Sequence, residues 1–270
     1  MSGVLILGRG LLGSELARAW PNATIVGRET LDLTADSINL PPGEWQWVIN
    51  AAAYTSVDRA ESEARLAMQA NAIGPGRLAA ACRERGAILL SISTDFVFGG
   101  DLGRPYVEDD EPRPLGVYAR TKREGEVRIL DQGGVIVRTA WLFGDGPCFP
   151  RTMVRLYKEG RDLRVVNDQF GSPTWTRDVA AGLKTLMEGE PAGIYHVAGS
   201  EVVSWHELAE RSLRAWTGHR VPVTPITTDD FPTAAPRPRY SALSIAKMAQ
   251  LGYAPTPLDE ALRAWATESS

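Results

Sequence analysis

The sequence predicts an α/β fold built on a doubly wound parallel sheet. Short apolar runs alternate with helical segments, and a glycine-rich turn directly follows the first apolar run. This alternation favours parallel strands covered by helices on both faces. Strands are expected near residues 4–7, 23–27, 47–50, 87–92, 134–138 and 193–197, and the main helices over residues 14–20, 62–84, 117–131 and 176–188.

The first expected strand leads into a glycine-rich turn. Residues 4–7 are wholly apolar, as expected for a strand buried on both faces, and G-x-G-x-x-G follows at residues 8–13. Gly8 permits a tight turn, Gly10 the close approach of a pyrophosphate, and Gly13 close packing of helix against strand. The helix start offers N–H groups and a positive dipole end to phosphates. A Rossmann-type dinucleotide site is predicted, with an ordinary glycine-rich turn as the alternative.

The second expected strand is followed by a cation. Arg28 comes directly after residues 23–27, and Arg9 lies in the glycine turn. An arginine suits a 2′-phosphate, whereas NAD sites usually place a carboxylate here, so both residues favour NADPH over NADH as the cofactor. A solvated loop cation is the alternative for Arg28, and NADH stays open. Asp32 and Leu33 follow at positions suited to cover the adenine.

The third expected strand ends in small residues. Residues 47–50 run into Ala51, Ala52 and Ala53. Small residues at the carboxyl end of a strand allow a cofactor to lie across the sheet edge. Ala52 and Ala53 are therefore predicted cofactor contacts.

Tyr118 and Lys122 stand four residues apart in the helix expected over residues 117–131. They share one helix face, about one turn apart. A nearby cation favours the phenolate, so we expect Lys122 to lower the pKa of Tyr118 from about 10 toward neutrality. Such a pair is typical of a general acid, and Thr94 and Asp95 precede it at the end of another strand. Ordinary helix-surface neighbours are the alternative.

The composition excludes several function classes. The chain has 270 residues, a net charge of −4 and an estimated pI of 5.5, which is not the basic footprint of a nucleic-acid-binding protein. No apolar stretch approaches the length of a membrane span, and the first residues show no signal-peptide pattern. We therefore expect a cytoplasmic protein that binds neither nucleic acid nor membranes.

Cysteine and histidine spacing predicts no metal site. Cys82 and Cys148 lack a C-x-x-C or ligand spacing, and we expect both to be buried small residues in a reducing compartment. The three histidines, His196, His206 and His219, also lack ligand spacing. His196 lies within an expected strand and is predicted to be a packed residue rather than a catalyst.

The later part of the chain has a different composition. Prolines, tryptophans and arginines are frequent at residues 145–175 and again after residue 199, which favours extended, loop-rich structure. We predict a cofactor domain of residues 1–144 plus 176–198, and a smaller discontinuous α/β substrate domain of residues 145–175 plus 199–270. The cleft between them is expected to receive the substrate.

Five strings lie in order along nearly the whole chain, at residues 50–61, 93–98, 117–122, 138–144 and 167–174. They resemble those of the extended short-chain dehydrogenase/reductases, and more narrowly those of the dTDP-4-dehydrorhamnose reductase family. D-Q-x-G-x-P-T, in the last of them, is the most diagnostic. The glycine turn is one residue shorter than the G-x-x-G-x-x-G that is typical of the family.

The resemblance implies roles at matching positions. Thr94 would hydrogen-bond a substrate carbonyl, Tyr118 would donate a proton, and Lys122 would hold the nicotinamide ribose. The implied cofactor contacts are Gly10, Leu11 and Leu12 at the pyrophosphate, Asp32 and Leu33 at the adenine, and Ala53, Tyr54 and Thr55 near the ribose and phosphates.

The resemblance also implies sugar-nucleotide contacts from Thr94, Asp95 and Trp141. For Trp141 the alternative is core packing, and for Asp95 it is capping of the neighbouring backbone. Arg237, within P-R-P-R, has a planar guanidinium suited to clamping a diphosphate, but a solvated charge run is equally open.

The implied activity is NAD(P)H-dependent reduction of the 4-keto group of a nucleotide-linked 6-deoxyhexose, with dTDP-L-rhamnose as the favoured product. Another 4-keto-deoxysugar nucleotide is one alternative, and a catalytically silent regulatory subunit is another. Some family members pair as dimers, so a homodimer is also open.

Overall fold

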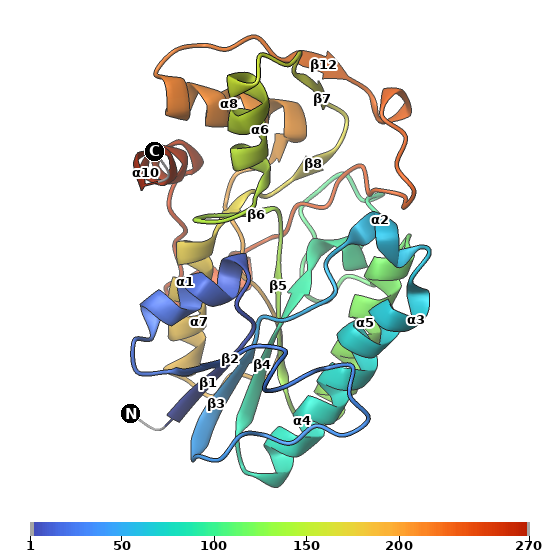
Figure 1. Cartoon of the computed structure of the whole chain (residues 1–270), viewed down its shortest axis with the longest axis vertical. Helices are drawn as coiled ribbons and strands as arrows, with labels where there is room; N and C mark the ends of the chain where they lie inside the picture. The colour runs from blue at the N-terminus through green and yellow to red at the C-terminus, as the bar shows by residue number, and fades with distance from the viewer. Residues whose placement is uncertain (1–2, 269–270) are drawn as a thin grey trace.

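The computed structural model describes residues 3–268 and shows a six-stranded parallel sheet with helices on both faces (Figure 1). The order of the strands reverses between β1 and β3, so the carboxyl ends of these two strands form a topological switch point, where ligands bind in such sheets. The fold class predicted from the sequence is confirmed. In spatial order the strands are β2 (Thr24–Val26), β1 (Gly3–Leu7), β3 (Trp45–Asn50), β4 (Ile88–Thr94), β5 (Val135–Thr139) and β10 (Gly193–His196).

Two helix layers cover the sheet. α1 (Leu11–Ala19) and α7 (Thr176–Met187) pack on one face, and α4 (Gly74–Glu84) and α5 (Val117–Leu130) on the other. Alternate residues of β1 serve the two layers, because successive side chains of a strand point to opposite faces. Ile6 packs with Leu16 and Leu183, while Leu7 packs with Leu78. Full burial of each such side chain contributes about 1.5–3 kcal/mol.

Two helices differ from the expectation. The first begins at Leu11 rather than at residue 14, because the extended backbone of Gly10 serves as its N-cap. The helix expected over residues 62–84 is present as α3 (Ala64–Met68), a π-helical turn at Gln69–Ile73, and α4. At Gly74, a Cβ would collide with the carbonyl oxygen of Leu33, so a glycine is required where this helix crosses the loop after β2.

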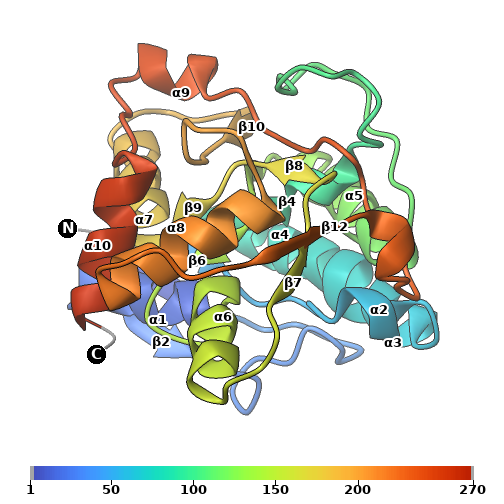
Figure 2. The ribbon, with the colours of Figure 1, turned by 90° about the horizontal axis from the view of Figure 1, so that it is seen from above.

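A second layer lies above the carboxyl ends of the sheet strands (Figures 1 and 2). Its apolar core includes Trp265, which is fully buried and donates to the carbonyl of Gly144 at 3.0 Å. Met248 and Tyr253, also from the carboxyl-terminal part, pack instead with the α1–α7 side of the sheet. The paired strands of this layer are β6 (Leu142–Phe143) with β9 (Thr174–Trp175), β7 (Arg164–Val166) with β12 (Thr224–Ile226), and β8 (Phe170–Gly171) with β11 (Val203–Ser204). The helices here are α6 (Phe149–Lys158), α8 (Trp205–Thr217) and α10 (Leu258–Glu268). Of the two remaining short helices, α2 (Val57–Ala60) contacts α5, and α9 (Ala246–Gln250) contacts β10.

Over residues 3–268, none of the helices is both long enough and apolar enough to span a membrane.

Candidate active site

The glycine turn has a geometry suited to a pyrophosphate. Gly8 has φ of +111°, and a Cβ on Gly13 would collide with the carbonyl oxygen of Gly8, so both positions require glycine for α1 to pack on the end of β1. A Cβ on Gly10 would meet nothing within 4 Å, so open space lies beside it. No side chain caps α1 at Gly10, and the amides of Leu11 and Leu12 stand at the positive end of the helix. These residues fit a dinucleotide.

A cleft of about 210 Å³ adjoins this turn. Leu31 and Leu33 give it apolar walls suited to an adenine ring. Thr55, which follows Tyr54, is exposed and is not part of the lining. The predicted cofactor residues that line the cleft are Gly8, Arg28, Asp32, Leu33, Ala52, Ala53 and Tyr54.

Both predicted 2′-phosphate ligands are already ion-paired. Nε of Arg28 lies 3.0 Å from Oδ2 of Asp32, and Nη1 of Arg9 lies 2.8 Å from Oε1 of Glu29. Arg28 also donates to the hydroxyl of Thr34. Both arginines are largely exposed, and Arg28 lines the cleft, whereas Arg9 does not. A 2′-phosphate would have to compete with the carboxylate beside each cation.

Asn71 is a structural partner of this site that the sequence analysis did not identify. It lies in the π-helical turn and is 2% exposed. Its side chain accepts from the amide of Tyr54 at 2.8 Å and donates to the Tyr54 carbonyl and the Thr121 hydroxyl. Thr121 in turn donates to the carbonyl of Tyr118 at 2.8 Å. Asn71 therefore ties the loop after β3 to the turn of α5 that carries Tyr118. The available signal was weak, because Asn71 is one of two side-chain amides in the turn Gln69–Ile73.

Thr94 and Asp95 end β4 in a hydrogen-bonded turn. The Thr94 hydroxyl accepts from the amide of Phe96 at 3.2 Å and donates to Asp95 Oδ1 at 3.1 Å. Asp95 is 3% exposed, and the hydroxyl of Ser241 donates to its Oδ2. Desolvation raises the pKa of Asp95 to about 7, although hydrogen bonds from Ser241 and Thr94 act in the opposite direction. Asp95 thus binds the side chain of its neighbour Thr94 and that of Ser241, 146 positions away, so its role extends beyond its own turn.

Tyr118 and Lys122 do not show the pKa relationship that their spacing predicted. Tyr118 is half-buried, and desolvation raises its pKa to about 12, with a hydrogen bond to Thr94 opposing the rise. Lys122 is buried, its Nζ donates to the carbonyl of Ile92 at 2.7 Å, and desolvation lowers its pKa to about 8. The expectation of a lowered phenol pKa is wrong for the protein alone, because burial outweighs any attraction from the cation. Tyr118 is instead firmly protonated at neutral pH.

Trp141 has an unusual backbone. Its φ of +46° is the only positive φ of a non-glycine residue within residues 3–268, and such conformations cost about 1–3 kcal/mol. The indole stacks on Trp205 of α8 with 3.5 Å between ring centroids, and a Cβ on Gly171 would collide with it. Gly171 belongs to D-Q-x-G-x-P-T. Trp141 therefore packs against two segments of the upper layer, while its ring stays partly exposed.

Arg237 is not a solvated cation. It is only 16% exposed, its Nη2 lies 2.7 Å from Oδ2 of Asp58 in α2, and its Nη1 donates to the carbonyl of Ala235. The ion pair joins the last part of the chain to the cofactor side of the molecule.

Other titratable residues lie away from these groups. His196 is fully buried, and desolvation lowers its pKa to about 3, so the prediction of a packed residue is confirmed. Cys82 is buried as expected, and its pKa is raised to about 12. The burial expected for Cys148 is wrong: it is half-exposed, because it occupies the N-cap of α6.

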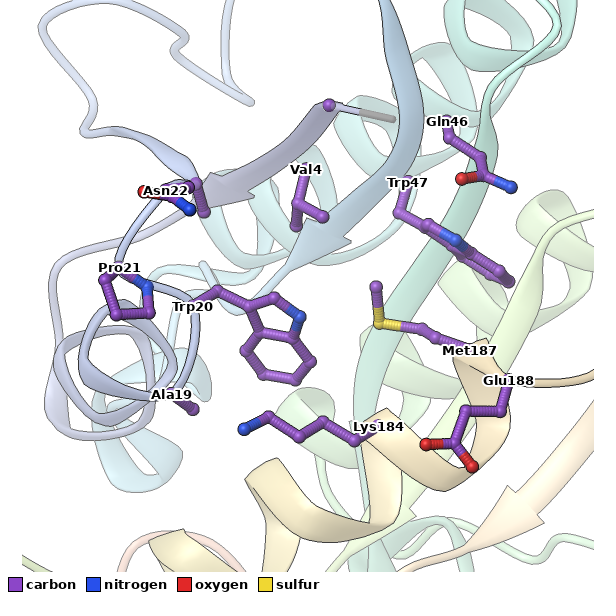
Figure 3. A pocket seen from close by; sticks show the side chains of 12 residues that line it. Val4, Ala19, Trp20, Pro21, Asn22, Gln46, Trp47, Lys184, Met187 and Glu188 are labelled. Atoms are coloured by element: carbon purple, nitrogen blue, oxygen red, sulfur yellow. The ribbon is translucent and has the colours of Figure 1, made fainter. Parts of the chain in front are cut away.

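A larger cavity, of about 540 Å³, lies at the amino ends of β1 and β3, opposite the glycine turn (Figure 3). Its walls include Val4, Trp20 and Trp47, and none of the predicted site residues lines it. Nζ of Lys184 lies 5.3 Å from the Trp20 ring centre, so the protein's own cation covers that aromatic face. Despite its size, this cavity contains neither Thr94, Tyr118 and Lys122 nor the glycine turn. The edge formed by the carboxyl ends of the strands is therefore the candidate active site.

Residues 1–270 match a family model described as the RmlD substrate binding domain. The chain is 42% identical to a dTDP-4-dehydrorhamnose reductase from Streptomyces griseus, over 91% of this chain and 86% of the relative. It is 37% identical to a dTDP-4-keto-6-deoxy-D-glucose reductase from Streptomyces niveus, over 82% of this chain and 76% of the relative. A solved dTDP-4-dehydrorhamnose reductase from Bacillus anthracis str. Ames, in complex with NADP, is similar with a TM-score of 0.89, 34% identity and 99% coverage of both chains.

Proposed function

This chain belongs to the dTDP-4-dehydrorhamnose reductase family, and we propose that it reduces the 4-keto group of a nucleotide-linked 6-deoxyhexose with NADPH. The substrate that we favour is dTDP-4-dehydro-L-rhamnose, which would give dTDP-L-rhamnose. The relatives named for this reaction and the NADP complex of a similar structure support the assignment.

The observation that carries the proposal is the meeting of three groups at one sheet edge. Thr94 ends β4, Tyr118 and Lys122 stand on consecutive turns of α5, and the Thr94 hydroxyl is hydrogen-bonded to Tyr118. The glycine turn lies on the same edge, because β1 and β4 are parallel strands of one sheet. A proton donor, a hydroxyl and a cation are therefore grouped beside a dinucleotide cradle.

The protein would act on the developing alkoxide. Tyr118, which is protonated at neutral pH, donates its proton to the former carbonyl oxygen as that atom gains charge. The Thr94 hydroxyl, which donates to Asp95 in the protein alone, turns to donate its hydrogen bond to the same oxygen instead, and this bond stabilises the charge. Lys122 binds the nicotinamide ribose and supplies positive charge next to Tyr118.

The rest of the edge would hold the cofactor. The amides at the start of α1 bind the pyrophosphate, the cleft by Leu33 and Ala52 holds the adenosine, and Arg28 and Arg9 bind the 2′-phosphate. When bound, the reduced nicotinamide supplies the hydride that reduces the sugar carbon. Asp95, Trp141 and Arg237 are proposed contacts of the sugar nucleotide.

Two alternatives are separated by one assay. The relative named for dTDP-4-keto-6-deoxy-D-glucose favours a different 4-keto sugar as the second candidate substrate. Purified protein is given NADPH or NADH with a panel of 4-keto-sugar nucleotides, and the loss of reduced-cofactor absorbance and the sugar product are measured. Turnover with dTDP-4-dehydro-L-rhamnose supports the proposal, and turnover with another ketose changes the substrate only. Tight NADPH binding without any turnover would indicate a regulatory subunit instead.

A further inference from the structure

We propose that Glu126 is a positioning residue of this active site: its buried carboxylate, held by Arg138, fixes the end of β4 that carries Thr94 against the turn of α5 that carries Lys122. The inference deepens the proposed function and rests on it.

The Glu126 carboxylate is almost fully enclosed and receives donors on both oxygens. Oε1 accepts from the hydroxyl of Ser93 at 2.6 Å and from Nε of Arg138 at 2.8 Å. Oε2 accepts from Nη2 of Arg138 at 2.8 Å and from Arg123 at 3.1 Å. Glu126 is 1% exposed and Arg138 is 0% exposed, so this is a bidentate ion pair in the interior.

Arg138 also contacts two aromatic rings besides Glu126. Its guanidinium lies 5.0 Å from the ring centre of Phe98, and its Nη1 lies 3.5 Å from Nε2 of His196. His196 Nδ1 lies 3.1 Å from the Tyr106 carbonyl, which can only accept, so Nδ1 carries the proton and Nε2 accepts from Arg138. The lowered pKa of His196 keeps this ring neutral. The network therefore spans the carboxyl ends of β4, β5 and β10.

Glu126 and its partner Ser93 both lie close to residues of the proposed reaction. Ser93 directly precedes Thr94, and Lys122 stands one helical turn before Glu126 on α5. Lys122 makes its own contact with β4 through the carbonyl of Ile92 at 2.7 Å. Two hydrogen bonds thus join α5 to consecutive residues, Ile92 and Ser93, at the end of β4.

The carboxylate also acts on Lys122 through its charge. Burial lowers the pKa of Lys122 to about 8, and the negative charge of Glu126 opposes that shift. Two polar residues from other elements also contact α5. Asn71, from the π-helical turn, carries no charge, and the carboxylate of Glu61 accepts from the amide of Val117. The charged or titratable groups around Lys122 on α5, on β5 and in the turn after β4 are Tyr118, Arg123, Glu126, Arg138 and Asp95.

Stability alone does not account for this pair. Replacing a buried ion pair by apolar residues of similar volume is often neutral or stabilising, so a buried carboxylate here is weak evidence of a purely structural role. One carboxylate oxygen of Glu126 accepts from Ser93, the residue before Thr94, and its charge acts on Lys122. This placement points to a role in positioning Thr94 and Lys122.

The test compares Glu126→Gln with Glu124→Gln. Glu124 is on the same helix and pairs with Arg128 at 2.8 Å, but this pair is exposed, so the second variant is a matched control for charge removal on α5. Each variant is measured for thermal unfolding, for NADPH affinity by fluorescence titration across pH, and for kcat across pH.

We expect Glu126→Gln to fold and to lower kcat at least about 10-fold. In this variant, NADPH binding and kcat should begin to decline at a pH that is lower by about half a unit or more. The reason is that protonated Lys122 loses the negative charge that stabilises it. Glu124→Gln should match the wild type. Unchanged kcat and an unchanged pH profile in folded Glu126→Gln would overturn the inference.

A second variant covers the case in which Glu126→Gln does not fold. Ser93→Ala keeps the ion pair and removes only the link to β4, and we expect kcat to fall about 5-fold with little change in the apparent Tm. Wild-type kcat in this variant would then overturn the inference. The pH dependence of NADPH binding can be measured without any turnover of substrate. A wild type that binds NADPH but reduces no ketose therefore contradicts the proposed function, whereas an unshifted binding profile in Glu126→Gln contradicts only the positioning role.

Discussion

The hydroxyl of Ser241 donates a hydrogen bond to the buried carboxylate of Asp95, across 146 positions of sequence. Ser241 is 1% exposed, and its amide donates to the carbonyl of Phe170 in β8. One residue therefore connects the end of β4 to the upper layer. Asp95, next to Thr94, is held in place by a segment that lies outside the central sheet.

Ser241→Ala is expected to raise KM for the sugar nucleotide about 10-fold, with a smaller change in kcat. The substitution leaves one Asp95 oxygen without its donor, which costs about 1–3 kcal/mol, and it raises the pKa of Asp95 further. Steady-state kinetics at fixed NADPH measure the effect. The exposed Ser200→Ala is the control, and equal KM values in the two variants would contradict the assignment of Asp95 to substrate binding.

Tyr118→Phe is expected to lower kcat at least about 100-fold while NADPH affinity stays within about 2-fold, because only the proton donor is removed. Single-turnover kinetics and fluorescence titration provide the two numbers. Near-normal turnover would remove Tyr118 from its assigned role.

Activity is expected to decline as the pH rises through about 8. The lowered pKa of Lys122 means that its positive charge is present below that pH and is lost above it. In Lys122→Arg, whose guanidinium stays charged, kcat should be lower but the decline at this pH should disappear. The measurement is kcat/KM for NADPH across pH. The prediction is contradicted if kcat/KM of the wild type stays constant up to about pH 10, where an ordinary lysine loses its proton.

Asp95→Asn is expected to change the pH dependence of stability. The folded pKa of about 7 lies above the ordinary value of 3.8, so the folded protein binds this proton more tightly than the unfolded chain. The stabilisation from this group is complete below the ordinary value and is lost as the pH rises through about 7. The free energy of unfolding of Asp95→Asn, relative to wild type, should therefore rise by about 2 kcal/mol between about pH 5 and pH 8. Urea unfolding at both pH values tests this, and a constant difference would be incompatible with it.

Arg28→Ala is expected to raise KM for NADPH about 10-fold and to leave KM for NADH within about 2-fold, because only NADPH carries the 2′-phosphate. Arg155→Ala is a suitable control, since Arg155 is an exposed cation of α6 paired with Glu159. Equal changes in KM for NADPH and NADH would mean that Arg28 forms the ion pair with Asp32 and does not bind the 2′-phosphate.

The sequence by itself determined the sheet and most of the cofactor edge. Apolar runs such as residues 4–7 predict buried strands, because a strand covered on both faces needs apolar side chains throughout. The glycine turn was equally readable, since Gly8 and Gly13 meet steric demands that other residues cannot. Tyr118 and Lys122 were found by their helical spacing, which is a local property.

Only the tertiary structure decided how these groups are held and charged. The pKa of Tyr118 rises rather than falls, because desolvation depends on everything packed around the phenol and not on the residue four positions away. Asn71, Ser241 and Glu126 gave little or no sequence signal, since each contacts partners distant in the chain. Spacing along a helix predicts which side chains share a face. Burial and long-range hydrogen bonds, which set their protonation and position, exist only once the chain has folded.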